Sequence, residues 1–356
     1  MTLTLSIIFI LETSNYIKIE IRNGEKKGIP IIMSSFHSKY VILFHGNCID
    51  GWMSCFIAHS SLSRHGTVRQ YPIAPGQPNT WAMAEKIMRN THVLLLDVSV
   101  PKETREKWFL NGALSVNCID HHASAVEDWP AHACPIHVES CAALQTWHWI
   151  YPNLEVPTWL YHIDRVDRWD NPTEEDRCIR EVLNIIAHKP VERKFDEAFD
   201  MTREFIETMS TPEGVLLTIE KGREILRKKD GALYPVLGKG TILSMTPELQ
   251  ALWNLPASWA TIKLFIIDNT DISFDSTEAA HQVFTYYPQA DVFINYRRRT
   301  FLEKGDMAVE KTVYTYSARS HGFHLTEGDS VFKGHPTSAG ASLVQGEVSV
   351  LPFIKK

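Results

Sequence analysis

Short apolar runs alternate with helix-like segments from Tyr40 onward. The apolar runs consist mainly of Val, Ile and Leu without polar alternation, which is typical of strands buried on both faces of a parallel sheet. The segments between them are long enough for crossover helices, so the pattern predicts βαβ units. The expected strands are Tyr40–Phe44, Val68–Ile73, His92–Leu96 and Leu114–Ile119, and the expected helices are Trp52–Arg64, Thr80–Arg89 and Lys102–Leu110.

The pattern then changes twice along the chain. Two helical stretches, Ser140–Ile150 and Val156–Arg165, lead into a charged and mostly helical region from Pro172 to Lys229. Its last helix is expected to begin at Thr211, because threonine is a good N-cap and Pro212 suits the first helical position. Short β runs return at Thr241–Met245, Thr261–Ile267, Asp291–Tyr296 and Thr312–Ala318.

These patterns predict an α/β protein built in four parts. Residues 1–39 are an N-terminal extension to which the sequence assigns no role, and residues 40–170 are expected to form a parallel-sheet domain. Residues 171–230 would form a helical connector, and residues 231–356 a smaller domain of mixed α/β type.

Composition narrows the class of protein. The chain has 356 residues, 44% hydrophobic and 22% charged, which excludes a disordered, collagen-like or disulfide-rich protein. Its net charge of −6 argues against a protein that holds long nucleic acid through many phosphate contacts. The six cysteines form no CxxC pair, and the apolar run Leu3–Leu11 is too short to cross a membrane. We therefore expect reduced thiols and a cytoplasmic protein with no membrane partner.

Ionisable side chains follow three of the expected strands at the point where each strand ends. They are His45 with Asp50 in the turn after it, Asp97, and the triplet Asp120, His121 and His122. Because the carboxyl ends of parallel strands meet at one edge of the sheet, where ligands bind, these side chains are expected to lie close together. Asp164, near the end of a helix, is a fourth contributor.

This grouping indicates a metal site. A lone aspartate after a strand is more often a helix N-cap, so the joint pattern carries the hypothesis. Carboxylates crowded at one edge repel one another unless cations neutralise them. Three carboxylates and two imidazoles suit Mn²⁺ or Mg²⁺, and the histidines favour Mn²⁺. Asp97, at the centre of the edge, would bridge the ions if two are bound.

The same residues resemble, in order, the four motifs of the DHH phosphoesterase superfamily. The matching segments are His45-Gly46-Asn47-Cys48-Ile49-Asp50-Gly51, the single Asp97, Asp120-His121-His122 and the segment around Asp164. Further along, Tyr316–Ser320 and Lys333–Gly340 are similar to the Arg-Ser and Gly-His-Pro signatures of the DHH-associated C-terminal domain. The matches extend from about position 40 to position 343.

The resemblance implies a two-lobed hydrolase of phosphoester or phosphoanhydride bonds that uses one or two Mn²⁺ ions per chain, with Mg²⁺ as the alternative. The metal ligands that it implies are His45, Asp50, Asp97, His121 and Asp164.

Further roles come from the same resemblance. Asp120 would orient a histidine, and His122 would face the phosphate and help the leaving oxygen depart. Arg319, Gly334 and His335 would hold phosphate or nucleotide from the C-terminal lobe.

The chain departs from the family pattern in the first motif. Many members place two aspartates after the histidine, whereas this chain has Asn47 and one aspartate, and a neutral Asn is a weaker ligand. The fourth motif offers both Asp164 and Asp167. Asp164 keeps the Tyr-x-x-Asp spacing and is the expected ligand, while Asp167 is expected to pair with Arg165 or Arg168.

The leading hypothesis is a metal-dependent phosphoesterase, a hydrolase that acts on phosphodiester or phosphomonoester bonds of short oligonucleotides or nucleotides. The alternatives are a pyrophosphatase or exopolyphosphatase of the same superfamily, and a catalytically weak nucleotide-binding regulatory protein, which Asn47 keeps open. The run Arg297–Arg299 is equally consistent with a phosphate clamp and a solvated strand end. The tryptophans around the fourth motif are expected to pack in the core rather than stack on bases. The sequence is also compatible with a homodimer.

Overall fold

The computed structural model describes residues 38–74, 85–86, 89–122, 125, 129, 136–270, 274–303, 309–321, 324–325, 330, 332–335 and 338–344. Three parts of the chain discussed above lie outside these residues. They are the expected N-terminal extension up to residue 37, Cys134 and most of the expected helix Thr80–Arg89. The domain boundaries expected from the sequence stay predictions.

The first sheet is parallel throughout, and it confirms the four expected strands. Its strands are β1 (Ser38–His45), β2 (Gly66–Ile73), β3 (His92–Leu96) and β4 (Ser115–Ile119), in the order β2-β1-β3-β4. Because β3 pairs with both β1 and β4, the residues that follow it lie between the ends of its two neighbours.

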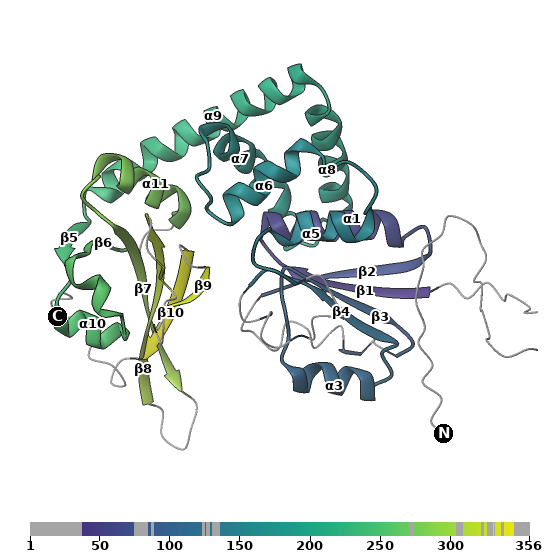
Figure 1. Ribbon diagram of the computed structural model, residues 1–356, viewed down its shortest axis with the longest axis horizontal. Coiled ribbons are helices and arrows are strands. Elements are labelled where there is room, and N and C mark those ends of the chain that lie inside the picture. The colour runs from purple at the N-terminus through teal and green to yellow at the C-terminus, as the bar shows by residue number, and fades with distance from the viewer. Residues whose placement is uncertain are drawn as a thin grey trace, which may run out of the picture. The chain divides into compact units, whose positions relative to one another are not determined.

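Helices cover both faces of this sheet, as continuous apolar strands require. Helices α1 (Ile49–Leu62) and α5 (Ala142–Ile150) lie on one face, and α3 (Lys102–Leu110) lies on the other (Figure 1). Alternate residues of each strand enter separate cores, with Ile42 packed on the α1 side and Val41 on the side of Trp108 in α3.

After α5, the described chain continues with α6 (Thr158–Asp167), α7 (Glu174–His188), α8 (Phe195–Met209) and α9 (Pro212–Leu237). The expected start of α9 is confirmed, because Thr211 Oγ1 accepts a hydrogen bond from the amide of Gly214 at 3.1 Å. Helices α7 and α9 pack closely where a Cβ on Gly222 would lie 2.0 Å from the carbonyl oxygen of Cys178. Among the described helices, none is both long and apolar enough to cross a membrane.

The second sheet is mixed, as expected for the C-terminal region. Its strands are β5 (Thr241–Ser244), β6 (Lys263–Asp268), β7 (Val292–Glu303), β8 (Val309–Ser320), β9 (Lys333–His335) and β10 (Ser338–Val344), in the order β5-β6-β7-β8-β10-β9. Of the pairings described in this second sheet, only β6–β7 is parallel. Helix α11 (Ser276–Tyr286) and the end of α9 pack on one face, and α10 (Pro247–Trp253) with the 3₁₀ segment η2 (Ala257–Thr261) packs on the other. The α/β fold class is therefore confirmed.

One expected strand end is wrong. The run was expected to stop at Tyr296, before Arg297–Arg299, but β7 continues to Glu303 because it stays paired with β8 as far as Val309. These arginines lie within a strand, and Arg298 and Arg299 are exposed. Their proposed role as a phosphate clamp remains a prediction.

Candidate metal centre

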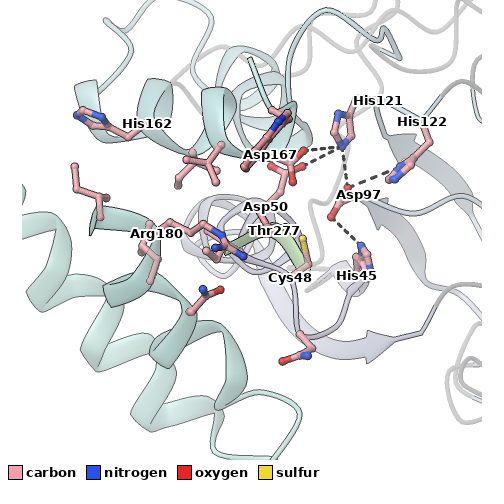
Figure 2. Close-up of a pocket in the computed structure, with 18 of the residues that line it drawn as sticks. His45, Cys48, Asp50, Asp97, His121, His122, His162, Asp167, Arg180 and Thr277 are labelled. Atoms are coloured by element: carbon pink, nitrogen blue, oxygen red, sulfur yellow. Dashed lines mark hydrogen bonds and ion pairs between the residues drawn. The ribbon is translucent and has the colours of Figure 1, made fainter. Parts of the chain in front are cut away.

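The carboxyl edge of the parallel sheet gathers the side chains that the sequence predicted to meet there. His45 is the last residue of β1, Asp97 follows β3, and Asp120 follows β4. Asp97 Oδ2 lies 3.2 Å from His45 Nδ1, and Asp97 Oδ1 lies 3.2 Å from His121 Nε2 (Figure 2). Asp97 therefore occupies the central position expected of a bridging carboxylate.

Three carboxylates converge on one nitrogen of His121. Its Nε2 lies 3.2 Å from Asp97 Oδ1, 3.2 Å from Asp167 Oδ2 and 3.5 Å from Asp50 Oδ2. A single N–H on Nε2 cannot satisfy three acceptors together, whereas a divalent cation among the same oxygen and nitrogen atoms would neutralise them. The donor set fits Mn²⁺ or Mg²⁺ by its chemistry.

The backbone around the site is held in uncommon conformations. Asn47 and Asp97 both have left-handed φ values, +60° and +58°. Such strain at non-glycine residues persists where the surrounding structure fixes it, and it concentrates at functional sites. Gly51 lets α1 begin against the end of β1, because a Cβ there would lie 2.3 Å from the carbonyl oxygen of His45.

Asp120 makes the contact expected of an orienting residue. Its Oδ1 lies 2.7 Å from His122 Nδ1 and accepts hydrogen bonds from the amides of His121 at 2.7 Å and His122 at 3.2 Å. The carboxylate thus holds the His122 ring by Nδ1, and the residue lines the cavity. His122 is partly exposed there, with 29% of its side chain accessible.

Asp50 serves two parts of the structure. Its carboxylate accepts hydrogen bonds from the amides of Ala142 at 2.8 Å and Ala143 at 2.6 Å, in the first turn of α5. Negative charge is stabilised at a helix N-terminus, where amides lack partners within the helix. Asp50 is therefore fixed beside His121 by a helix that comes 92 residues later in the chain.

The expected preference for Asp164 over Asp167 is not what the geometry shows. Asp164 accepts from the amide of Cys141 at 2.6 Å and from Arg168 at 3.0 and 2.8 Å, so this carboxylate caps α5 and holds an arginine. Asp167 instead lies 3.2 Å from His121 and lines the cavity. The expected partners of Asp167 are also engaged elsewhere, since Arg165 pairs with Asp176.

The electrostatics follow from this crowding. Burial raises the pKa of Asp50 well above its ordinary value, and burial also raises the pKa of Asp167; the neighbouring carboxylates add to both shifts. Burial opposes ionisation of Asp97 as well, but contacts with His121 and His45 lower its pKa well below the usual range.

For the two histidines of the triplet, burial and the neighbouring carboxylates shift the pKa in opposite directions. Burial alone would lower the pKa of each, but Asp167, Asp97 and Asp50 raise the pKa of His121 to about 10, and Asp120 raises that of His122 to about 9. In the metal-free protein, protons on the imidazoles offset the negative charge of the carboxylates. A bound cation would offset the same charge in their place.

Cys48 is a site residue that the sequence reasoning missed. Its Sγ belongs to a group with ligand atoms of His45 and Asp97 that all lie within 4.8 Å of one another. Its place three residues after His45, in the first motif, was the available signal.

The cavity beside these groups has a volume of about 360 Å³ and a cationic side. Arg319 lines it, as expected, and its Nη2 lies 3.3 Å from Thr277 Oγ1. Arg180 of α7 also lines it, although nothing in the sequence singled this residue out; it pairs with Asp275 at 2.7 Å. Burial lowers the pKa of Arg319 to about 10, with Arg180 adding to that effect.

The other expected substrate-binding residues are placed only by their backbone. Gly334 and His335 belong to β9, which pairs with β10, and the side chain of His335 lies outside the described part of the structure. Of the four tryptophans around the fourth motif, Trp159 is buried and Trp147 packs against the same core, as expected. Trp169 instead lines the cavity, and Trp149 is 43% exposed.

No family model and no curated protein matches this chain. Among solved structures, it is similar to the pGpG-specific phosphodiesterase PggH from Vibrio cholerae, at 12% identity and a TM-score of 0.43, over 86% of this chain and 92% of that one. It is also similar to RecJ in complex with Mn²⁺ from Thermus thermophilus, at 11% identity and a TM-score of 0.42, over 86% and 50% of the two chains. A third structure, exonuclease RecJ bound to manganese, matches at 11% identity and a TM-score of 0.41, over 86% of each chain. These similarities are too low to assign a family. The resemblance to the DHH superfamily therefore rests on the sequence motifs and on the arrangement of the site residues.

Proposed function

We propose that this protein is a divalent-metal-dependent phosphoesterase that hydrolyses phosphodiester or phosphomonoester bonds in short oligonucleotides or nucleotides. The observation that carries this function is the convergence of Asp50, Asp97 and Asp167 on His121 at the sheet edge, in the same cavity as two arginines. With His45, these residues would hold divalent cations, and the carboxylates suit Mn²⁺ or Mg²⁺. Bound ions of this kind supply a water of lowered pKa as nucleophile and offset charge on phosphate oxygens.

His122 is the proposed general acid. Asp120 fixes its Nδ1 at 2.7 Å, and the residue lines the cavity that the candidate metal ligands also line. A carboxylate partner also favours the protonated ring, which suits a group that gives a proton to a departing oxygen.

Arg180 and Arg319 are the proposed phosphate-binding residues. Both line the cavity that the metal-binding side chains also line, together with Thr277. Guanidinium groups bind phosphate oxygens in a bidentate manner, and burial strengthens that attraction. A cavity of about 360 Å³ is of the size that holds a small ligand, so the proposed substrates are nucleotides or short oligomers.

The test is a hydrolysis panel in Mn²⁺ with a dinucleotide, short RNA and DNA oligomers, a 3′-phosphorylated nucleotide and pyrophosphate. Asp97→Asn should lower turnover at least about 100-fold, since even residues that only orient metal ligands are worth about 10–100-fold. Asp170→Asn is the matched control, because Asp170 comes shortly after the fourth motif but its side chain is 55% exposed.

Three outcomes would change the proposal. Phosphate released from pyrophosphate alone would make the protein a pyrophosphatase. Nucleotide binding without any product would favour a regulatory binding protein. Equal turnover by the wild type and Asp97→Asn would remove the metal centre from the mechanism.

A further inference from the structure

Of the three overlapping groups of possible ligand atoms among the described residues, two differ in donor chemistry, and we call them the two halves of the candidate metal centre. One half contains His45, Cys48 and Asp97, which offer a nitrogen, a sulfur and an oxygen within 4.8 Å of one another. The other half contains Asp50, His121 and Asp167, which offer two oxygens and a nitrogen at the same spacing. Figure 2 shows both groups around Asp97, with the sulfur of Cys48 next to His45.

Cys48 is set apart from the other cysteines by its surroundings. Of the five described cysteines, Cys55, Cys118, Cys141 and Cys178 are buried, and Cys48 alone is partly exposed, lining the cavity. It stands at the N-cap of α1, where Ser, Thr, Asp or Asn is the stabilising choice. A cysteine there is of little use to the helix, but its sulfur lies near two other ligand atoms.

The turn before Cys48 explains how its sulfur reaches the site. Asn47 adopts a left-handed conformation with φ +60°, and Cys48 itself returns to extended backbone at φ −125°. The chain therefore reverses within three residues of His45. Gly51 allows this close return, because any Cβ there would meet the backbone of His45.

We propose that Cys48 is a metal ligand, and that the half-site of His45, Cys48 and Asp97 holds a thiophilic divalent ion such as Zn²⁺ or Co²⁺. The half-site of Asp50, His121 and Asp167 keeps the preference for Mn²⁺ or Mg²⁺. Thiolate and imidazole select softer ions, whereas carboxylates select harder ones. Three protein ligands with an open position are also the arrangement of catalytic zinc sites. This assignment rests on the proposed function, and it places a charged sulfur ligand in the motif where Asn47 replaces a carboxylate.

The experiment removes bound metal from the full chain with a chelator and then titrates it with Co²⁺, recording the thiolate-to-cobalt charge-transfer absorption band. Calorimetry measures the affinities for Co²⁺ and Mn²⁺ separately. The wild type should show the band. Cys48→Ser should lose it and weaken Co²⁺ binding roughly tenfold or more relative to Mn²⁺. Asp167→Asn should keep the band while weakening Mn²⁺.

Cys118→Ser is the matched control, because the Cys118 thiol donates to the carbonyl of Val98 on the far face of the sheet, and a serine hydroxyl can make the same bond. It should keep the band at full strength.

The outcomes separate this inference from the proposed function. A band that survives in Cys48→Ser, or a wild type that binds Mn²⁺ and turns over substrate but shows no band, would overturn the role of Cys48 and leave the phosphoesterase intact. A wild type that binds neither ion would overturn both.

Discussion

The two aspartates near the end of α6 give the sharpest prediction, because they lie three residues apart and make different contacts. Asp167→Asn should remove a proposed metal ligand and leave the fold intact. Asp164→Asn should weaken the fold and leave metal binding intact. The spacing in the sequence alone favours the opposite assignment.

The magnitudes follow from what each carboxylate touches. Asp164 accepts from Arg168 twice and from the amide of Cys141, and its side chain is only 10% exposed. Hydrogen bonds to charged groups contribute about 1.5–3 kcal/mol, and a helix cap contributes about 1 kcal/mol. Asparagine keeps one acceptor and Arg168 is 24% exposed, so Asp164→Asn should lower the free energy of unfolding by about 1–3 kcal/mol.

Asp167 differs from Asp164 in its partners, because within the described residues its carboxylate pairs with the imidazole of His121 rather than with an arginine. Burial and the charge of Asp97 raise its pKa, so its ionised form is disfavoured in the metal-free protein. Asp167→Asn should therefore leave the stability of the metal-free protein unchanged or increase it. Loss of a ligand should weaken Mn²⁺ binding by at least about 10–100-fold.

The assay combines urea unfolding of chelated protein with Mn²⁺ titration followed by electron paramagnetic resonance of the free ion. Both variants are measured beside the wild type. The reasoning is refuted if Asp164→Asn loses Mn²⁺ while remaining stable, and Asp167→Asn binds Mn²⁺ as the wild type does.

Three further predictions concern the same site. His122→Gln should lower kcat about 10²–10⁴-fold with Mn²⁺ affinity kept, and unchanged kcat would exclude it as the general acid. The free energy of unfolding of the metal-free protein should fall as pH rises from about 6.5 towards 10, because the folded state holds protons on His121 (pKa about 10) and His122 (pKa about 9) that the unfolded chain releases earlier. Urea unfolding at each pH measures this dependence. Saturating Mn²⁺ should make the free energy of unfolding depend less on pH, since the metal binds neutral imidazole. Gly51→Ala should cost about 1–3 kcal/mol or more and disturb metal binding, because its Cβ would lie 2.3 Å from the His45 carbonyl. Gly231→Ala, where nothing lies within 4 Å, should be neutral or stabilising in the same urea unfolding measurement, and equal losses in both variants would contradict the packing explanation.

The strands and the helices that flank them were predictable because their signal is local. A run such as Leu94–Leu96 reads as a buried strand from its own residues, and Thr211 with Pro212 reads as a helix start. The end of β7 was not predictable in this way, because its extension through Arg297–Arg299 depends on pairing with β8. Strand pairing is a non-local contact, and the three arginines themselves carry no sign of it.

By itself, the sequence determined that His45, Asp97 and the Asp120–His122 triplet would share one sheet edge, since parallel strands must place their carboxyl ends together. Only the tertiary structure decided between Asp164 and Asp167. The α-helix turns by about 100° per residue, so residues three apart lie near one another on the same side, and spacing cannot say which carboxylate lies beside His121. The answer came from Arg168, one turn beyond Asp164, and from the N-terminus of α5, which together hold Asp164 away from His121.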